Sequence, residues 1–402
     1  MHSAHAGQDA PCGDPPRLLV GLLPLLFTTL ICWTTPLTRY GDGYDSDGKF
    51  YAAMAGDPLF SCEYSRAAPW CFRILTPWLA SLLPLQTLDA FRVIGFAAGW
   101  LSLTLLLWIL RRLEFDERLS AIGLALYAAV FWSVKFSFRS PAYIDSLTQS
   151  FLLAIVLLTL GRRYLAVVMV VAVGALQKES VPLFGLFALV SYAGQEGRTG
   201  RRVLAYAICL IVLPLLVLVS VRASIQPIRQ YSTAGAVLES LSLAVTPGML
   251  PRLVHAALSG LGILPALLLL RPAASLGFLL RHREWLALAG VGLVLLFGGR
   301  DRSRLFLYVL PVAVVLAVNL LAVLGRPGRI WLAVTLVIHA AIGRHRWRIG
   351  WQEEYLASLV PEHSPGLSYV PNLVGTALVL TVWFFASRRL LAAGRPPGER
   401  AS

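Results

Sequence analysis

The chain has 402 residues, of which 57% are hydrophobic and only 14% are charged, and its formal net charge is +14. A soluble domain carries roughly 25% charged residues, so this composition excludes an ordinary soluble protein and predicts one that crosses a membrane several times. The positive charge does not indicate a nucleic-acid partner, because the arginines form short clusters between apolar segments and no nucleic-acid-binding motif is present.

A polar tail, residues 1–17, precedes the first apolar segment and is expected in the cytoplasm. That segment, Leu18–Leu37, is long enough to cross a bilayer and lacks a clear cleavage site, so we expect a retained helix and not a signal peptide. With the later apolar segments it predicts an all-α polytopic bundle over residues 18–387, with about 10–12 transmembrane or half-membrane helices. The later segments are Val93–Leu110, Leu119–Val134, Ser146–Leu160, Tyr164–Gln177, Val181–Ala193, Val203–Val221, Ala256–Leu270, Trp285–Gly299, Leu305–Gly325, Ile330–Gly343 and Leu373–Ser387.

The loops between these segments differ in length and charge. The short ones are dense in arginine, which assigns them, with the basic tail 388–402, to the cytoplasmic side. The longer loops hold more carboxylates than the short ones and are then extracytoplasmic, and the first of them covers residues 38–88. Prolines interrupt Asp57–Leu88 and Arg222–Val254, which predicts short helices lying along the membrane surface.

Only Lys178, Glu179 and Ser180 separate two of the apolar segments, Tyr164–Gln177 and Val181–Ala193. This spacing favours a tight hairpin whose tip reaches the outer side, and one long kinked helix is the alternative. A charged pair at such a tip is costly unless it is paired or faces a polar cavity. The two side chains therefore either lock to each other or belong to a site.

The first outer loop holds four carboxylates, Asp42, Asp45, Asp47 and Asp57. A carboxylate at this position could accept a proton from a sugar hydroxyl. Asp45 and Asp47 could instead hold a divalent cation such as Mg or Mn, and a solvated acidic turn is the alternative to both. Cys62 and Cys71 in the same loop are either bridged or free.

Arginines on the outer side form a second group of candidate site residues. They include Arg300, Arg302 and Arg304 in the loop before Leu305–Gly325, and Arg73 in the first outer loop. Guanidinium groups bind phosphate through two parallel hydrogen bonds, so these residues indicate an anionic partner, and lipid headgroups are the alternative.

Three other residues have simpler interpretations. Asp145 begins the segment Ser146–Leu160, where it either caps the helix or joins the site. His255 and His339 are lone histidines near or in apolar segments, so they are expected to be satisfied core residues rather than ligands.

One stretch of the chain resembles a known family. The sequence SDGKFYAAMAGDP, followed by FRILTPWLASLLP, is similar to a pattern in bacterial membrane proteins tied to cell-surface glycopolymers, which have the GT-C layout of polytopic glycosyltransferases. The usual form there is YDGQFY, then Ala-x-Asp-Pro, then Arg-(Ile/Val)-Leu-x-Pro. The matching residues are Asp47, Gly48, Phe50, Tyr51, Asp57, Pro58, Arg73, Leu75 and Pro77.

The chain departs from this pattern at Ser46 and Lys49, which leaves open whether Asp45 or Asp47 is the working carboxylate. The specific part of the resemblance covers Asp42–Pro84. Asp145, the pair of Lys178 and Glu179, and the sequence RSRLFLYVLP around Arg304 also resemble such enzymes.

The resemblance implies a glycosyltransferase of the bacterial inner membrane. It would transfer a sugar, with inversion, from a polyprenyl-phosphate donor to a glycan, lipid or protein acceptor on the extracytoplasmic face. Asp47 would be the general base, helped by Asp45 or Asp57. The expected substrate-binding residues are Arg73, Asp145, Lys178, Glu179, Arg300, Arg302 and Arg304. The alternatives are a flippase or transporter for lipid-linked saccharides and a polymerase of lipid-linked repeat units.

Overall fold

The computed structural model describes residues 17–37, 44, 47–57, 59–195, 199–228, 249–297, 302–324, 329–344 and 369–393, with residues 232, 235, 238 and 242. Every regular element in this part of the chain is a helix, and it contains no strand. The predicted all-α class is therefore confirmed.

The helices follow the predicted apolar segments closely. Tyr164–Gln177 was predicted with the bounds that the structure has. In the N-terminal half they are α1 (Arg17–Thr34), α2 (Gly48–Gly56), α3 (Leu75–Ser81), α4 (Thr87–Arg112), α5 (Glu117–Ala129), α6 (Phe136–Arg139), α7 (Asp145–Leu160), α8 (Tyr164–Gln177), α9 (Gly185–Ala193) and α10 (Gly200–Ser224). In the C-terminal half they are α12 (Met249–Leu261), α13 (Leu264–Leu268), α14 (Pro272–Arg281), α15 (Arg283–Leu295), α16 (Arg302–Leu305), α17 (Leu310–Val323), α18 (Arg329–Arg344) and α20 (Tyr369–Ala393). Single turns join some of them, namely η2 (Tyr64–Arg66), η3 (Trp70–Phe72), η4 (Phe131–Lys135), η5 (Val181–Phe184) and η6 (Phe306–Tyr308).

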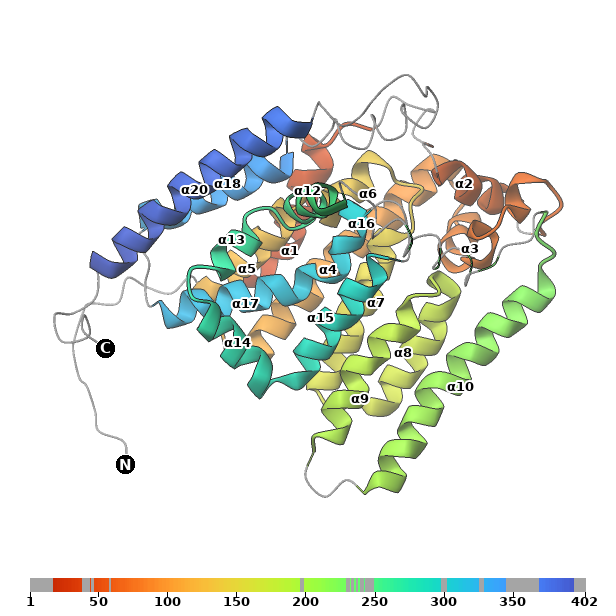
Figure 1. Ribbon diagram of the computed structural model, residues 1–402. Coiled ribbons are helices and arrows are strands. Elements are labelled where there is room, and N and C mark those ends of the chain that lie inside the picture. The colour runs from red at the N-terminus through yellow and green to blue at the C-terminus, as the bar shows by residue number, and fades with distance from the viewer. Residues whose placement is uncertain are drawn as a thin grey trace.

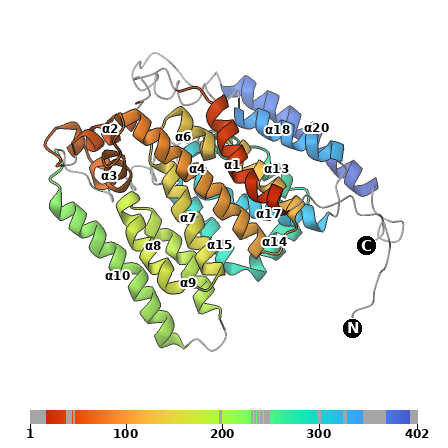
Figure 2. The same ribbon diagram turned by 180° about the vertical axis from the view of Figure 1, so that it is seen from behind.

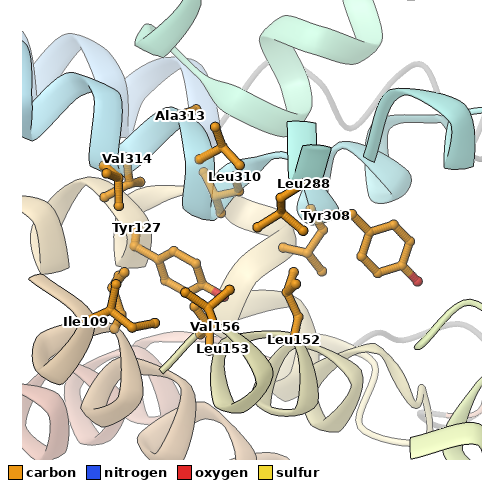
Figure 3. Close-up of a cluster of buried hydrophobic side chains, with 14 of the residues drawn as sticks. Ile109, Tyr127, Leu152, Leu153, Val156, Leu288, Tyr308, Leu310, Ala313 and Val314 are labelled. Carbon is orange, nitrogen blue, oxygen red and sulfur yellow. The ribbon is translucent and has the colours of Figure 1, made fainter. Parts of the chain in front are cut away.

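The centre of the bundle is formed by α4, α5, α7 and α17, in which α4 packs on α7 and α5, and α5 packs on α17. Apolar side chains from these helices interdigitate there, among them Ile109, Leu153, Val156 and Val314 (Figure 3). The α17 sequence is apolar on all sides, and a helix of that kind is stable only when its whole circumference is covered by apolar groups. Its residues from 310 to 318 are accordingly all buried.

Within the described part of the chain, two helices, α4 and α10, are long and apolar enough to cross a membrane. A third span results if α5 and the segment Phe131–Arg139, which meet at an angle of 55°, count as one broken helix. Several other apolar helices, among them α7, α8 and α17, have 10–17 residues and fall short of the roughly 20 residues that a full span needs. Among the residues that the structure describes, length and composition therefore support two or three of the many spans that the sequence predicts.

Helix α10 lies along the edge of the bundle against α8 (Figures 1 and 2). Only 11% of the most apolar 18-residue stretch of this helix is buried. Leu204, Ile211 and Leu216 on its outer surface are each more than half exposed. An apolar surface of this length is stable only next to other apolar groups, as lipid tails would provide.

The predicted hairpin is present: α8 and α9 lie side by side, and Lys178, Glu179 and Ser180 form the turn between them (Figure 1). Its two arms approach closely at Gly174, where an added Cβ would lie only 2.4 Å from Val181 Cγ1. Helix α8 ends because Lys178 adopts an extended backbone. Pro182 then enters the first turn of η5, where its missing N–H costs nothing.

Short helices cover the end of the bundle at which this hairpin turns. They are α2, η2, η3 and α3, and both views place α2 and α3 beside the ends of α8 and α10 (Figures 1 and 2). The first outer loop was thus correctly predicted to contain short helices. About half of the second such loop, Arg222–Val254, lies outside the described residues.

Candidate functional site

Six charged side chains from distant parts of the sequence meet at this end of the bundle. The charged cluster, as we call it, consists of Asp47, Arg73, Asp145, Lys178, Glu179 and Arg304. They come from the start of α2, the turn after η3, the start of α7, the turn after α8, and α16. The charges are balanced, with three carboxylates and three cations, as a buried group of charges must be to limit the cost of desolvation.

Four members form one continuous chain of ion pairs. Lys178 Nζ donates to Asp145 Oδ1 at 2.8 Å. The second oxygen of Asp145 lies 3.5 Å from Arg304 Nη1. Arg304 in turn donates from Nη1 and Nη2 to Asp47 Oδ2, at 3.3 and 3.2 Å. The Arg304 guanidinium thus links Asp47, in the first outer loop, to Asp145, at the start of α7.

The other two members form a two-pronged ion pair. Arg73 donates from Nε to Glu179 Oε2 at 2.9 Å and from Nη2 to Glu179 Oε1, and from Nη1 to the hydroxyl of Tyr51 at 3.0 Å. This fork geometry joins two oxygens of one carboxylate to two nitrogens of one guanidinium. Tyr51 lies four residues after Asp47, one helical turn along α2, so it connects the two halves of the charged cluster.

The surroundings shift the pKa of the Tyr51 hydroxyl and of the Glu179 carboxyl. Burial raises the pKa of the Tyr51 hydroxyl to about 12, against the opposing effect of Arg73. Burial alone would also raise the pKa of the Glu179 carboxyl, but the adjacent Arg73 charge and its hydrogen bonds lower it to about 2. At neutral pH Tyr51 is therefore a neutral donor and Glu179 a carboxylate.

Aromatic rings and an amide fix the positions of the charges. The Arg304 guanidinium lies 5.0 Å from the centre of the Tyr143 ring, and Lys178 Nζ lies 5.5 Å from that of Tyr308. Gln177, the residue before Lys178, accepts from Thr76 Oγ1 and donates to the Ile144 carbonyl oxygen, both at 2.7 Å. These bonds tie α3, α8 and the start of α7 together directly beneath the charged residues.

Two buried hydroxyl groups next to Lys178 lack partners among the described residues, namely Ser180 Oγ and the Tyr308 hydroxyl. Tyr308 is 1% exposed, and its hydroxyl points away from the labelled core residues (Figure 3). Buried hydroxyls nearly always form a hydrogen bond. Here they are donors that an oxygen-rich ligand can use.

Apart from Asp57, the predicted site residues divide into three groups. Asp47, Arg73, Asp145, Lys178, Glu179 and Arg304 meet in the charged cluster. Asp45 and Arg300 lie outside the described residues. Arg302 lies on α16 two residues before Arg304, and since side chains two apart point to different sides of a helix, the two arginines do not share one face.

Asp57 was predicted to help catalysis, but the first outer loop itself uses its carboxylate. Oδ1 accepts from Ser61 Oγ at 2.6 Å, and Oδ2 accepts from the Cys62 N–H at 2.6 Å and from Ser65 Oγ at 2.7 Å. These hydrogen bonds lower the pKa of the exposed Asp57 carboxyl. The geometry favours a role in shaping the loop after α2.

Asp145 does not cap its helix, although the sequence alone allowed that role. It is the first residue of α7, and Ile144 occupies the capping position. Its side chain binds Lys178 and Arg304 instead. Lys178 and Glu179 likewise do not pair with each other, because each has its own partner of opposite charge on another element.

The structure settles whether Cys62 and Cys71 are bridged and tests the prediction that His339 is a satisfied core residue. Cys62 and Cys71 are free thiols, the first exposed and the second buried. His339 is a satisfied core residue, as predicted: Nδ1 accepts from the Ile263 N–H at 3.1 Å, and Nε2 lies 2.8 Å from the Leu126 carbonyl oxygen. The side chain of His255 is not described.

A divalent cation was considered for Asp45 and Asp47. Among the residues that the structure describes, no three His, Cys, Asp or Glu side chains are grouped as metal ligands would be. Asp47 pairs with a guanidinium, and Asp45 lies outside the described residues. The described residues therefore provide no ligand set for a metal, and no chemical step is assigned to one.

Sequence reasoning gave no role to Tyr51, Tyr143 or Tyr308. Tyrosines are common both in helical cores and at membrane interfaces, so their number and spacing give no signal. The one available signal was the position of Tyr51, which follows Asp47 by a helical turn within the stretch DGKFY.

No protein-family model matches the chain, and no curated protein matches it either. Function is therefore inferred from the site, because a fold by itself hosts many activities.

Proposed function

We propose that the protein is a membrane glycosyltransferase that takes its sugar from a polyprenyl-phosphate donor and works on the extracytoplasmic face of a bacterial inner membrane. One observation carries the proposal. Three cations and three carboxylates from five segments converge at one end of an apolar bundle, beside short helices of the first outer loop. Charged groups in such a chain are costly and mark functional sites by default.

The chemistry of such a transfer needs a base and an anion-binding site in close proximity. The acceptor hydroxyl gives its proton to Asp47, and its oxygen forms a bond to the anomeric carbon of the sugar. The bond from that carbon to the phosphate oxygen breaks, and the polyprenyl phosphate leaves with the electron pair. A single displacement of this kind inverts the sugar. Asp47 and Arg304 lie 3.2 Å apart, so the proposed base and a phosphate-binding cation are direct neighbours.

The cations in the charged cluster stabilise the leaving phosphate. Arg304, Lys178 and Arg73 are held by carboxylates and rings before any substrate arrives. Donors that are fixed in advance need no reorganisation as negative charge develops on the phosphate. Arg300, which lies outside the described residues, and Arg302, on another side of α16 from Arg304, are proposed as further donor ligands.

The first test is transfer by purified protein in lipid nanodiscs, with a labelled polyprenyl-phosphate sugar as donor and a mixed glycan and lipid fraction as acceptor. The wild type is expected to release polyprenyl phosphate and label the acceptor. Asp47→Asn, which keeps the size and removes the base, should lower the rate by roughly 100-fold or more. Asp89→Asn, at an exposed ion pair of α4, is the control and should keep full activity.

A carrier of lipid-linked saccharides is the competing function. It would move the labelled lipid between leaflets without releasing polyprenyl phosphate. Transporters are commonly built from paired structural halves, and the sequence has no internal repeat. Leaflet exchange by the wild type without any transfer would replace the enzyme by the carrier. Full transfer by Asp47→Asn at unchanged protein level would remove the proposed base.

A further inference from the structure

The two ends of the four-membered ion-pair chain differ in how tightly they are closed. The inner pair, Lys178 and Asp145, is 2.8 Å apart, and its side chains are 7% and 4% exposed. The outer pair, Arg304 and Asp47, is 3.2 Å apart, and its side chains are 15% and 18% exposed. Charge-assisted bonds of this kind usually measure about 2.7–2.9 Å, so the outer pair is the looser and more accessible one.

The outer pair is also only half of a full arginine–carboxylate pair. Both guanidinium nitrogens approach the same oxygen, Asp47 Oδ2, instead of one oxygen each. Arg73 and Glu179 in the same site form the full pair, in which two guanidinium nitrogens bond two different carboxylate oxygens. Asp47 is therefore the carboxylate of the charged cluster that is most easily exchanged.

Arg304 has supports that do not depend on Asp47. Its guanidinium lies beside the Tyr143 ring, and Nη1 lies 3.5 Å from Asp145. These contacts hold the arginine in place if Asp47 moves away. The reverse does not hold for Asp47, which sits at the start of the short helix α2.

Charge balance sets what can replace Asp47. The charged cluster is neutral, so an additional buried anion would leave an unpaired negative charge. The phosphodiester of a polyprenyl-phosphate sugar carries one negative charge, as Asp47 does. Exchange of one for the other leaves Arg304 paired with a single negative charge, and phosphate oxygens accept from a guanidinium as carboxylate oxygens do.

We propose that Asp47 occupies Arg304 as a stand-in for the donor phosphate and is displaced when that phosphate binds. This inference rests on the proposed function. Before the donor arrives, Asp47 Oδ2 is held by the Arg304 guanidinium, and the carboxylate is directed at this arginine and not at an acceptor. Afterwards Arg304 holds the phosphate, and the freed carboxylate faces the acceptor hydroxyl. Donor binding then frees Asp47 to act as the base in the same step, and this coupling suppresses transfer of the sugar to water.

The exchange predicts a gain of affinity in an inactive variant. The probe is farnesyl phosphate at about pH 5, where a phosphate monoester carries mostly one negative charge, as the donor phosphodiester does. It is titrated into protein in phosphatidylcholine nanodiscs and followed by calorimetry. Asp47→Asn removes the competitor for Arg304 and should tighten binding by roughly three- to tenfold, as a partly exposed ion pair is worth. Arg304→Gln should abolish binding. The control Asp89→Asn, which removes a carboxylate that pairs only with exposed Arg92, should change affinity by less than about twofold.

Unchanged or weaker binding by Asp47→Asn would overturn the exchange, because Asp47 would then not compete with phosphate. Equal tightening by Asp89→Asn would also overturn it, since a general loss of negative charge would explain the result. Folding of each variant is checked by its thermal midpoint in the same nanodiscs. Since Asp47→Asn is expected to be folded, its affinity is measurable whatever its activity.

Two competition experiments identify the source of the phosphate that the site binds. Inorganic phosphate in the buffer and phosphatidylglycerol in the disc should each fail to displace farnesyl phosphate at equal concentration. Displacement by phosphatidylglycerol would make the site a headgroup site and overturn the link to the donor. The binding experiment is separate from sugar transfer, so tightening in Asp47→Asn without any transfer by the wild type would defeat the proposed function alone.

Discussion

Arg73 and Glu179 show how a single pair can hold the short outer helices to the core of the bundle. The pair joins the turn after η3 to the tip of the α8–α9 hairpin, and Tyr51 of α2 shares the same guanidinium. Its side chains are 12% and 32% exposed. Breaking a pair of this kind leaves a buried charge unmatched, which costs more than the intact pair contributes.

The lowered pKa of Glu179 makes this pair sensitive to acid. A depressed carboxyl pKa stabilises the folded state above the ordinary value of 4.5, and this stabilisation is lost as the pH falls toward about 2. Wild type should therefore exceed Glu179→Gln in stability by roughly 1 kcal/mol at pH 7, with the difference shrinking below pH about 4.5. Thermal midpoints between pH 7 and 3 measure it.

The exposed carboxylate Glu63 provides the control for this prediction, and Glu63→Gln should leave the acid dependence unchanged. A difference between wild type and Glu179→Gln that stays constant from pH 7 to 3 would show that Glu179 does not act through its charge.

The charged members of the site were predictable from sequence, whereas their partners were not. Lys178 and Asp145 stand out because a charge is rare in an apolar chain. Which carboxylate meets which cation depends on how α2, α7, α8 and α16 pack, and that packing joins residues more than 250 positions apart, as in the case of Asp47 and Arg304. Tyr51 carries no charge at neutral pH, so only its position one helical turn after Asp47 marked it.

At the scale of single elements, the turn between α12 and α13 depends on Gly262. This residue has φ of +60°, and an added Cβ would lie 2.4 Å from His339 Nδ1. The His339 ring must come this close because Nδ1 accepts from the Ile263 N–H and Nε2 bonds the Leu126 carbonyl oxygen. One buried histidine thus joins α18 to α5 and to the α12–α13 turn.

Gly262→Ala should destabilise the protein by about 2 kcal/mol or more, because the left-handed backbone is strained for alanine and the ring must shift. Gly290→Ala is the matched control. That glycine lies in α15 with nothing within 4 Å of the added Cβ, so alanine should be neutral or slightly stabilising. Thermal midpoints in nanodiscs compare the two, and equal midpoints would refute the assignment of strain to Gly262.

The elements themselves were largely predictable, and their bends were not. Long apolar stretches bounded by arginines marked α4, α8 and α10, because hydrophobicity and length specify such helices without regard to neighbours. The predicted segment Leu119–Val134 is in fact α5 followed by the differently directed η4. Nothing in its composition marks the break, where Ser133 bonds back to the Tyr127 and Val130 carbonyl oxygens.

At the scale of the whole molecule, the proposed function requires that the charged end of the bundle faces outward. Cys62 offers a natural probe, since it is a free and exposed thiol of the loop after α2. Cys71 nearby is buried, and burial raises the pKa of its thiol to about 11, which suppresses the reactive thiolate.

A variant that keeps only Cys62 should react with a membrane-impermeant maleimide on intact spheroplasts. A variant that keeps only Cys12, in the tail predicted to be cytoplasmic, is the matched control and should react only after lysis. The opposite pattern would place the charged cluster on the cytoplasmic side and reject the extracytoplasmic assignment.

The central claim is that a phosphate-linked lipid docks on the charged cluster, and an experimental structure in nanodiscs with farnesyl phosphate tests it most directly. We expect the phosphate within hydrogen-bond distance of Arg304, with Asp47 turned away from the guanidinium. Phosphate density at a distant position, with the pair of Asp47 and Arg304 still in place, would contradict the account.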